Sequence, residues 1–164
     1  MNKEQYIYDY DYDLNIVKPT VAEFMVDKSN LRKGRLAAIV LDHVRDYRAV
    51  QLDISSNMVL NTIKDACPDA VFVRDVCNAS KHAILTNTHK IPITISNTEQ
   101  IKAESNKGLW SAPFGHSMFG ESNYVFIKFD NYQLVYGERV SFRNLHDCIN
   151  ELIQFWDKQL DIKD

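Results

Sequence analysis

The chain has 164 residues, of which 45% are hydrophobic and 25% charged, with a formal net charge of −3. This length predicts one domain that folds without a metal or disulfide, and the composition excludes collagen-like, low-complexity and wholly disordered classes. The sequence pI of about 5.9 argues against a general basic surface for coating nucleic acid, although a local basic site is compatible with it. We find no apolar run long enough for a membrane span and no secretory signal pattern, so we expect a cytoplasmic protein with no membrane partner.

The cysteines and glycines give no sign of a metal or cofactor. Cys67, Cys77 and Cys148 are odd in number, far apart and outside any CxxC pair, which favours reduced, buried thiols over a zinc site. The glycines match neither a dinucleotide-binding nor a P-loop pattern. We therefore expect no metal and no cofactor.

The chain opens with a segment, residues 1–13, in which tyrosine and aspartate alternate from Tyr6 to Asp13. A period of two predicts an N-terminal strand or docking arm, and an acidic tail that binds a partner is the alternative. Helical periodicity and capping residues then predict four helices, over about 20–28, 30–50, 56–66 and 69–85.

The sequence pattern changes from helical to β-type after the fourth predicted helix. Residues 90–96 predict an edge strand, and 124–129 with 132–136 predict a hairpin that turns at Asp130 and Asn131. Residues 97–123 are expected to form a long loop, and such loops are usually functional. Helical periodicity returns from Phe142, with one apolar face made of Leu145, Ile149, Leu152, Trp156 and Leu160. The expected fold is mainly α: a bundle of four to five helices with a small antiparallel sheet or hairpin before the C-terminal helix.

The fourth predicted helix carries the most informative pattern. Arg74, Asn78 and His82 are spaced i, i+4 and i+8, so they form one row, which the pattern places opposite an apolar face. Asp75 and Lys81 flank this row. An imidazole can move a proton near neutral pH, and a guanidinium can stabilise charge on phosphoryl oxygens, as metal-independent phosphodiester cleavage requires. A polar row is also what any surface helix shows.

The stretch from Arg74-Asp75 through Asn78 to Lys81-His82, within a helical bundle, resembles the signature helix of HEPN-like proteins. The resemblance extends over roughly residues 20–160 in organisation, so we expect residues 1–164 to form a single HEPN-like domain. It implies cleavage of RNA without a metal, from a composite site across a homodimer, often in toxin–antitoxin or anti-phage systems. By position, Arg74, Asp75 and His82 would be catalytic, with Asn78 beside them. The seven residues between Arg74 and His82 are a longer interval than the family has.

Four residues are candidates for RNA binding. Lys81 adjoins the polar row, Arg45 and Arg48 belong to a basic helix, and Trp110 lies in the long loop, where aromatic rings could stack on unpaired bases. Each has a plainer interpretation, as a solvated face or as loop packing. His43 could join a metal site with its neighbouring aspartates, but its place in an apolar stripe favours a buried, hydrogen-bonded histidine.

Two functional hypotheses follow. The first is a metal-independent endoribonuclease of a toxin–antitoxin or anti-phage system, acting as a homodimer on RNA and controlled by an antitoxin. The second is a non-catalytic HEPN-like interaction or regulatory module with a partner protein. Whether Arg74 and His82 meet at one phosphate-sized site distinguishes them.

Overall fold

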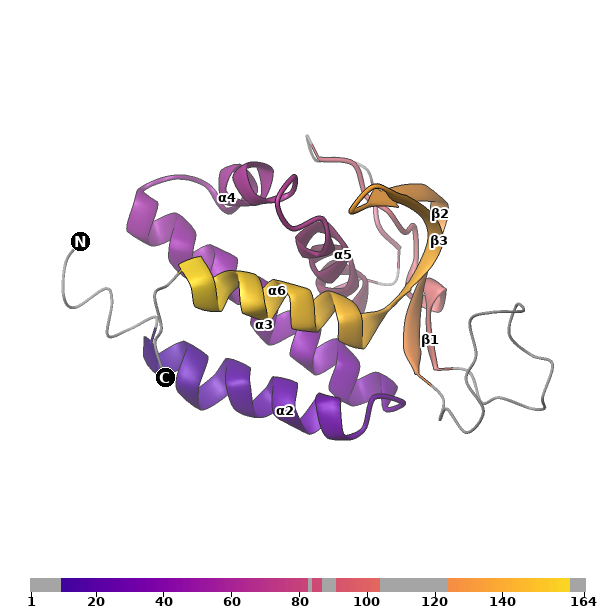
Figure 1. Cartoon of the computed structure of the whole chain (residues 1–164), viewed down its shortest axis with the longest axis horizontal. Coiled ribbons are helices and arrows are strands. Elements are labelled where there is room, and N and C mark those ends of the chain that lie inside the picture. The colour runs from indigo at the N-terminus through magenta and orange to yellow at the C-terminus, as the bar shows by residue number, and fades with distance from the viewer. Residues whose placement is uncertain (1–9, 83, 87–90, 104–123, 160–164) are drawn as a thin grey trace.

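The computed structural model describes residues 10–82, 84–86, 91–103 and 124–159. Helices form a bundle, and a three-stranded antiparallel sheet lies at one end of it (Figure 1). Within the described residues, every helix is too short or too polar to serve as a membrane span. The mainly helical fold with a small sheet before the last helix is thus as expected. The helices are η1 Asp13–Val17 (a π-helix), α2 Lys18–Val26, α3 Leu31–Leu52, α4 Ser56–Ile63, α5 Asp69–Lys81, η2 Thr98–Gln100 (a 3-10 helix) and α6 Leu145–Gln159.

The strand predicted within residues 1–13 is wrong for the part that the structure describes, and the docking arm stays a prediction. Residues 10–13 are helical and continue into η1, while residues 1–9 lie outside the described part. The Lys18 N–H donates to the Asp13 carbonyl, five residues back. Pro19 follows at once, and a proline ring would clash with a regular i−4 carbonyl, so the wider π-turn accommodates it. The first helix therefore begins before the expected Thr20.

α3 is the central helix and touches α2, α5 and α6. It begins as predicted at Asn30, whose side chain accepts a hydrogen bond from the Lys33 N–H at 3.1 Å. Gly34 permits the close approach of α2 and α6, because a Cβ there would lie 2.9 Å from Leu145 and 3.0 Å from Phe24. The short α4 begins after Ser55, which caps it.

The apolar face of α6 is confirmed. Its predicted residues up to Trp156 pack into the core, together with Cys148, and Trp156 is only 3% exposed, while Leu160 lies outside the described residues. All three cysteines are buried and form no disulfide, as expected. The buried residues of this helix are Leu145, Cys148, Ile149, Leu152 and Trp156.

The sheet differs in place from the prediction. Residues 91–96 form no strand, and the segment expected as a loop, 97–123, holds η2 and the first strand before it leaves the described part at residue 104. The hairpin turns at Tyr136 and Gly137, both with positive φ, which is the conformation that tight hairpin turns require. Asp130 and Asn131 instead lie within an irregularity of the second strand, between Lys128 and Gln133. The strands, in order across the sheet, are β1 Ile101–Ala103, β2 Val125–Val135 and β3 Glu138–Asn144.

Candidate functional site

α5 holds four of the five residues that the sequence analysis places in or beside the catalytic row. The helix begins after Pro68, a residue suited to a first turn, with Asp69 at its positive end. It ends at Lys81, and not near residue 85 as predicted. His82 is already extended, with φ −131° and ψ 124°, and its N–H donates to the Asn78 carbonyl. His82 therefore lies beyond the last helical turn.

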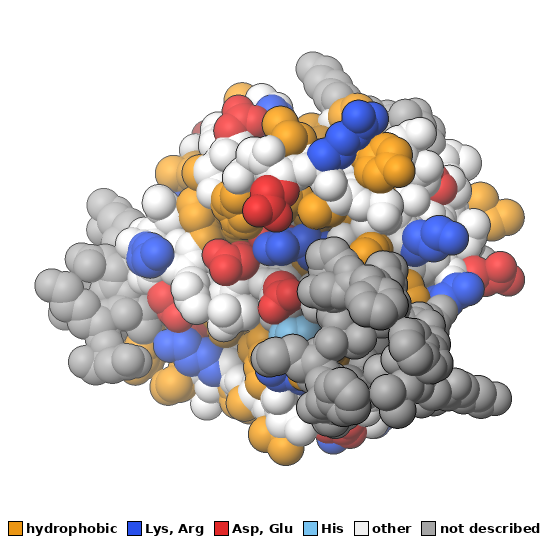
Figure 2. Space-filling view, turned by 45° about the vertical axis from the view of Figure 1, so that its right-hand side comes forward, with side chains coloured by type: hydrophobic (Ala, Val, Ile, Leu, Met, Phe, Trp, Pro, Cys, Tyr) orange, Lys and Arg blue, Asp and Glu red, His pale blue; other side chains and the backbone are white. Residues whose placement is uncertain are grey.

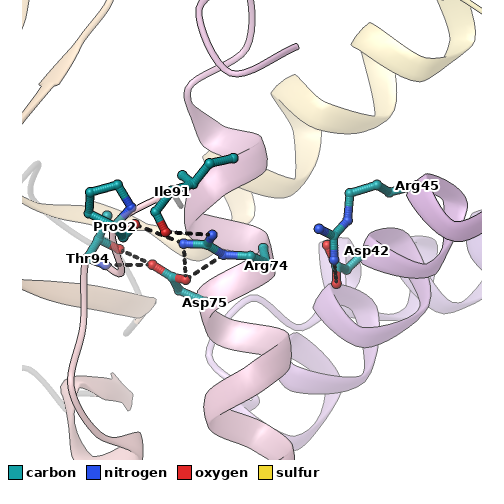
Figure 3. Close-up of polar contacts among 7 residues, drawn as sticks. All are labelled: Asp42, Arg45, Arg74, Asp75, Ile91, Pro92 and Thr94. Carbon is teal, nitrogen blue, oxygen red and sulfur yellow. Dashed lines mark hydrogen bonds and ion pairs between the residues drawn. The ribbon is translucent and has the colours of Figure 1, made fainter. Parts of the chain in front are cut away.

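Arg74 is enclosed, with 2% of its surface exposed. Its Nε donates to Asp75 Oδ1 at 2.8 Å, and its Nη2 lies 2.6 Å from the same oxygen. The other contacts are backbone carbonyls: Nη1 donates to Ile91 at 3.3 Å and Nη2 to Pro92 at 3.0 Å. Figure 3 shows the guanidinium surrounded by these partners. These hydrogen bonds use three of the five N–H donors of the guanidinium, one on each nitrogen, and the charge is paired with Asp75.

Asp75 is fully buried and completes the same cluster. Its Oδ2 accepts two hydrogen bonds from Thr94, from the backbone N–H and from the side-chain hydroxyl, both at 2.7 Å. Burial raises the pKa of Asp75, while Arg74 and Thr94 oppose that rise. Because every partner donates a hydrogen bond to Asp75, the carboxylate form fits the site. Arg74 and Asp75 together bind the 91–94 segment to α5, so we call them the α5 clamp.

The predicted exposure of Arg74 is therefore wrong, and the physical reason is the 91–94 segment. It covers the face of α5 that the periodicity predicts to be solvated. The row is divided: Arg74 and Asp75 are inside, Asn78 is half-buried, and Lys81 and His82 are exposed. The exposure predicted for His82 is confirmed. The side chains that would supply a cation and a proton carrier thus lie in different environments.

The basic helix, α3, is less available to phosphate than its sequence indicates. Arg45 Nη2 lies 3.0 Å from Asp42 Oδ2, with the two side chains only 11% and 8% exposed. Arg48 donates to Gln51 at 2.7 Å. Figure 3 shows the Asp42–Arg45 pair beside α5. The local basic patch predicted on this helix is therefore partly neutralised, and Trp110, the fourth RNA-binding candidate, lies outside the described residues.

His43 and the cysteines serve the interior. His43 is half-buried, and its Nδ1 lies 2.6 Å from the Ile39 carbonyl, as expected for a hydrogen-bonded core histidine. Burial raises the pKa of Cys67 and Cys77 to about 11, so both thiols stay protonated near neutral pH and are poor nucleophiles. Within the described part of the chain, no group of three His, Cys, Asp or Glu side chains is placed to hold a metal.

Sequence reasoning missed a second buried ion pair, at the opposite end of α5. Asp69, with no exposed surface, accepts from Arg143 of β3 through Nε at 2.7 Å and Nη2 at 3.0 Å. Tyr136 of the hairpin turn donates to the same carboxylate at 3.1 Å. An aspartate in a first helical turn is ordinarily explained by the helix dipole alone, so the local pattern gave no signal of this contact.

Electrostatics on the visible surface are mixed. On the face that Figure 2 shows, acidic and basic side chains are interspersed among hydrophobic ones.

Comparison of the chain with protein-family models, with curated proteins and with solved structures found no match. Function must therefore be argued from the geometry.

Proposed function

We propose that the chain is a non-catalytic interaction or regulatory module with an HEPN-like helical arrangement. The observation that carries this proposal is the enclosure of Arg74, which is 2% exposed and bound to Asp75 and two carbonyls. A cation that stabilises a phosphoryl group must touch it, and Arg74 would have to leave the α5 clamp to do so. Moving Arg74 out would leave the Asp75 charge buried alone, and removing one partner of a buried ion pair typically costs about 3–5 kcal/mol.

The metal-independent endoribonuclease of a toxin–antitoxin or anti-phage system is the second candidate. One observation favours it: His82 and Lys81 are both exposed at the end of α5, where an imidazole can exchange protons with a bound RNA. In this case a homodimer with facing α5 ends would bring two histidines and two lysines together. A monomer in light scattering at micromolar concentration would remove the composite site.

The deciding experiment incubates structured and unstructured RNA with the folded protein in EDTA, with wild type and His82→Ala compared. His82 is exposed, so this substitution leaves the core intact. We expect the RNA to stay whole with both proteins. Cleavage by wild type alone, leaving 2′,3′-cyclic phosphate ends, would overturn the proposed function and favour the nuclease. Arg74→Lys is a poor test, because it disturbs a structural ion pair and a catalytic role in the same change.

A further inference from the structure

The side of the sheet turned away from the helices carries a pattern that the proposed function has not used. Ile101, Val125, Ile127 and Phe129 are buried in the core. Strand side chains alternate, so the residues between them lie on the other side. We call this side the outer sheet face, made of Lys102, Phe126, Lys128 and Phe142; the two lysines and Phe142 are exposed and Phe126 is half-buried.

The strand register places these residues together. Lys102 of β1 is paired with Phe126 of β2, and Lys128 of β2 is paired with Phe142 of β3. Cross-strand partners have neighbouring Cβ atoms, so each lysine stands beside a ring. The two phenylalanine rings are 6.4 Å apart at an interplanar angle of 81°. The outer sheet face is thus two adjoining aromatic rings with a lysine beside each.

A second pair of the same kind lies further along the hairpin. The Arg139 guanidinium lies 4.6 Å from the centre of the Tyr132 ring, and this ring is 62% exposed. Beside it, Leu134 is 72% exposed. The hairpin therefore repeats the combination of a cation with an exposed aromatic ring.

The charge on this surface is positive although the chain is acidic overall. Among the described residues, Lys102, Lys128 and Arg139 form no ion pair. Asp130 of β2 is also exposed, and its partners Ser96 and Gln100 are neutral, so its carboxylate offsets one of these three positive charges. Glu138, at the hairpin tip, is the exposed carboxylate of β3.

We propose that the outer sheet face, with the Arg139–Tyr132 pair, binds single-stranded nucleic acid. Unpaired bases stack on exposed aromatic rings, while lysine and arginine neutralise the phosphates between them. A duplex offers no free base faces to these rings. A second copy of the chain is disfavoured, because it would bring like charges together. This inference names the ligand of the interaction module proposed above. It rests on that proposal, because the module would bind the nucleic acid without cleaving it.

The test measures fluorescence anisotropy of a labelled single-stranded RNA, a single-stranded DNA of the same sequence, and the matching duplex. We expect wild type to bind at least one single strand more tightly than the duplex. Three phosphate contacts predict a slope of log affinity against log salt of about −2. Comparing the affinities for the RNA and the DNA shows which kind of single-stranded nucleic acid the protein prefers.

Three variants locate the site. Phe126→Leu with Phe142→Leu keeps apolar side chains and removes the rings, and should weaken binding roughly 5-fold or more. Lys102→Ala with Lys128→Ala should weaken binding and flatten the salt slope. The control, Lys64→Ala with Lys158→Ala on α4's end and α6, changes charge equally and should bind as wild type. Circular dichroism confirms that each variant is folded.

Three results would overturn the inference: no binding by wild type, a preference for the duplex, or equal loss in the control and sheet variants. Gels of the same samples report on the proposed function separately. Intact RNA with no sheet-dependent binding rejects this ligand and leaves the non-catalytic module standing. Cleavage that His82→Ala abolishes rejects the module, whichever surface holds the strand.

Discussion

Asp75 uses both carboxylate oxygens inside the molecule, Oδ1 on Arg74 and Oδ2 on Thr94. With the two bonds from Arg74 to the Ile91 and Pro92 carbonyls, four hydrogen bonds tie α5 to a segment 17 to 19 residues further along the chain. A charged side chain of this kind is kept in the interior by its partners and not by its own solvation. We therefore treat Arg74 and Asp75 as residues that position the 91–94 segment.

Asp75→Ala is expected to lower the free energy of unfolding by about 3–5 kcal/mol, since it leaves the Arg74 guanidinium buried without a counter-charge. Urea denaturation measures the loss. The matched control is Asp65→Ala. The Asp65 carboxylate is 87% exposed and pairs with Lys64. Such surface pairs contribute about 0–1 kcal/mol. Equal losses in the two variants would contradict the α5 clamp as a structural element.

The ionisation of Asp13 makes the free energy of unfolding depend on pH. Only 4% of its surface is exposed, and it faces Lys18 of α2 and Asp157 of α6. Burial raises the pKa of Asp13 and Asp157 adds to the rise, while Lys18 opposes it. The folded state therefore holds the proton more tightly than the unfolded chain does. It follows that the free energy of unfolding falls as pH rises between the ordinary and the raised pKa.

Asp13→Asn removes this ionisation at nearly constant size. We expect the variant to be more stable than wild type near pH 7 and equal to it near pH 3, where the wild-type carboxyl is already protonated. Urea unfolding at both pH values gives the comparison. A difference of the same size at pH 3 and pH 7 would show that Asp13 acts through packing and not through its charge.

Among the elements, α2, α3 and α6 approach one another closely at Gly34. A Cβ on Gly34 would lie 2.9 Å from Leu145 Cδ2 and 3.0 Å from the Phe24 ring, and both of these side chains are fully buried. Gly34→Ala gains about 1 kcal/mol in helix propensity but loses roughly 1–3 kcal/mol by overpacking. We expect a net loss of stability in thermal or urea unfolding, whereas a gain would show that the helices separate freely here.

Local sequence predicted the helices well where one apolar face decides their packing. The stripe of α6 and the cap at Asn30 follow from side chains within one helix, and both are confirmed within the described residues. The sheet was harder. Asp130 and Asn131 have good turn chemistry, yet the register breaks there and the chain turns at Gly137, whose φ is +87°. Glycine at that position was an available signal for the turn.

The candidate site shows why a helical pattern alone can mislead. Arg74 falls on the polar side of α5, and periodicity assumes that the polar side meets water. Whether it does so depends on where residues 91–94 return, which is a contact across about 20 residues and leaves no trace in the helix itself. For His82 the prediction was correct in its exposure but not in its backbone, because α5 ends one residue before it.

For the whole molecule, Asp69 adds a buried polar link between sheet and bundle to the apolar packing of the strands on the core. This carboxylate at the start of α5 receives two hydrogen bonds from Arg143 of β3 and one from Tyr136 of the hairpin turn. Figure 1 shows α5 between the other helices and the sheet. Since α5 also packs on α3 and α6, Asp69 connects the sheet to the bundle through one buried group. We expect both parts to unfold together.

A double-mutant cycle tests this link. Arg143→Met leaves Asp69 buried without its cation, and Asp69→Asn leaves Arg143 without its anion, so each change alone should cost about 3–5 kcal/mol. The two changes together should cost less than their sum, because the double variant buries no uncompensated charge. Urea unfolding followed by circular dichroism measures the four stabilities. If the losses simply add, Asp69 and Arg143 act independently, and the sheet is held to the bundle by the buried apolar residues of β1 and β2 and by the direct continuation of β3 into α6.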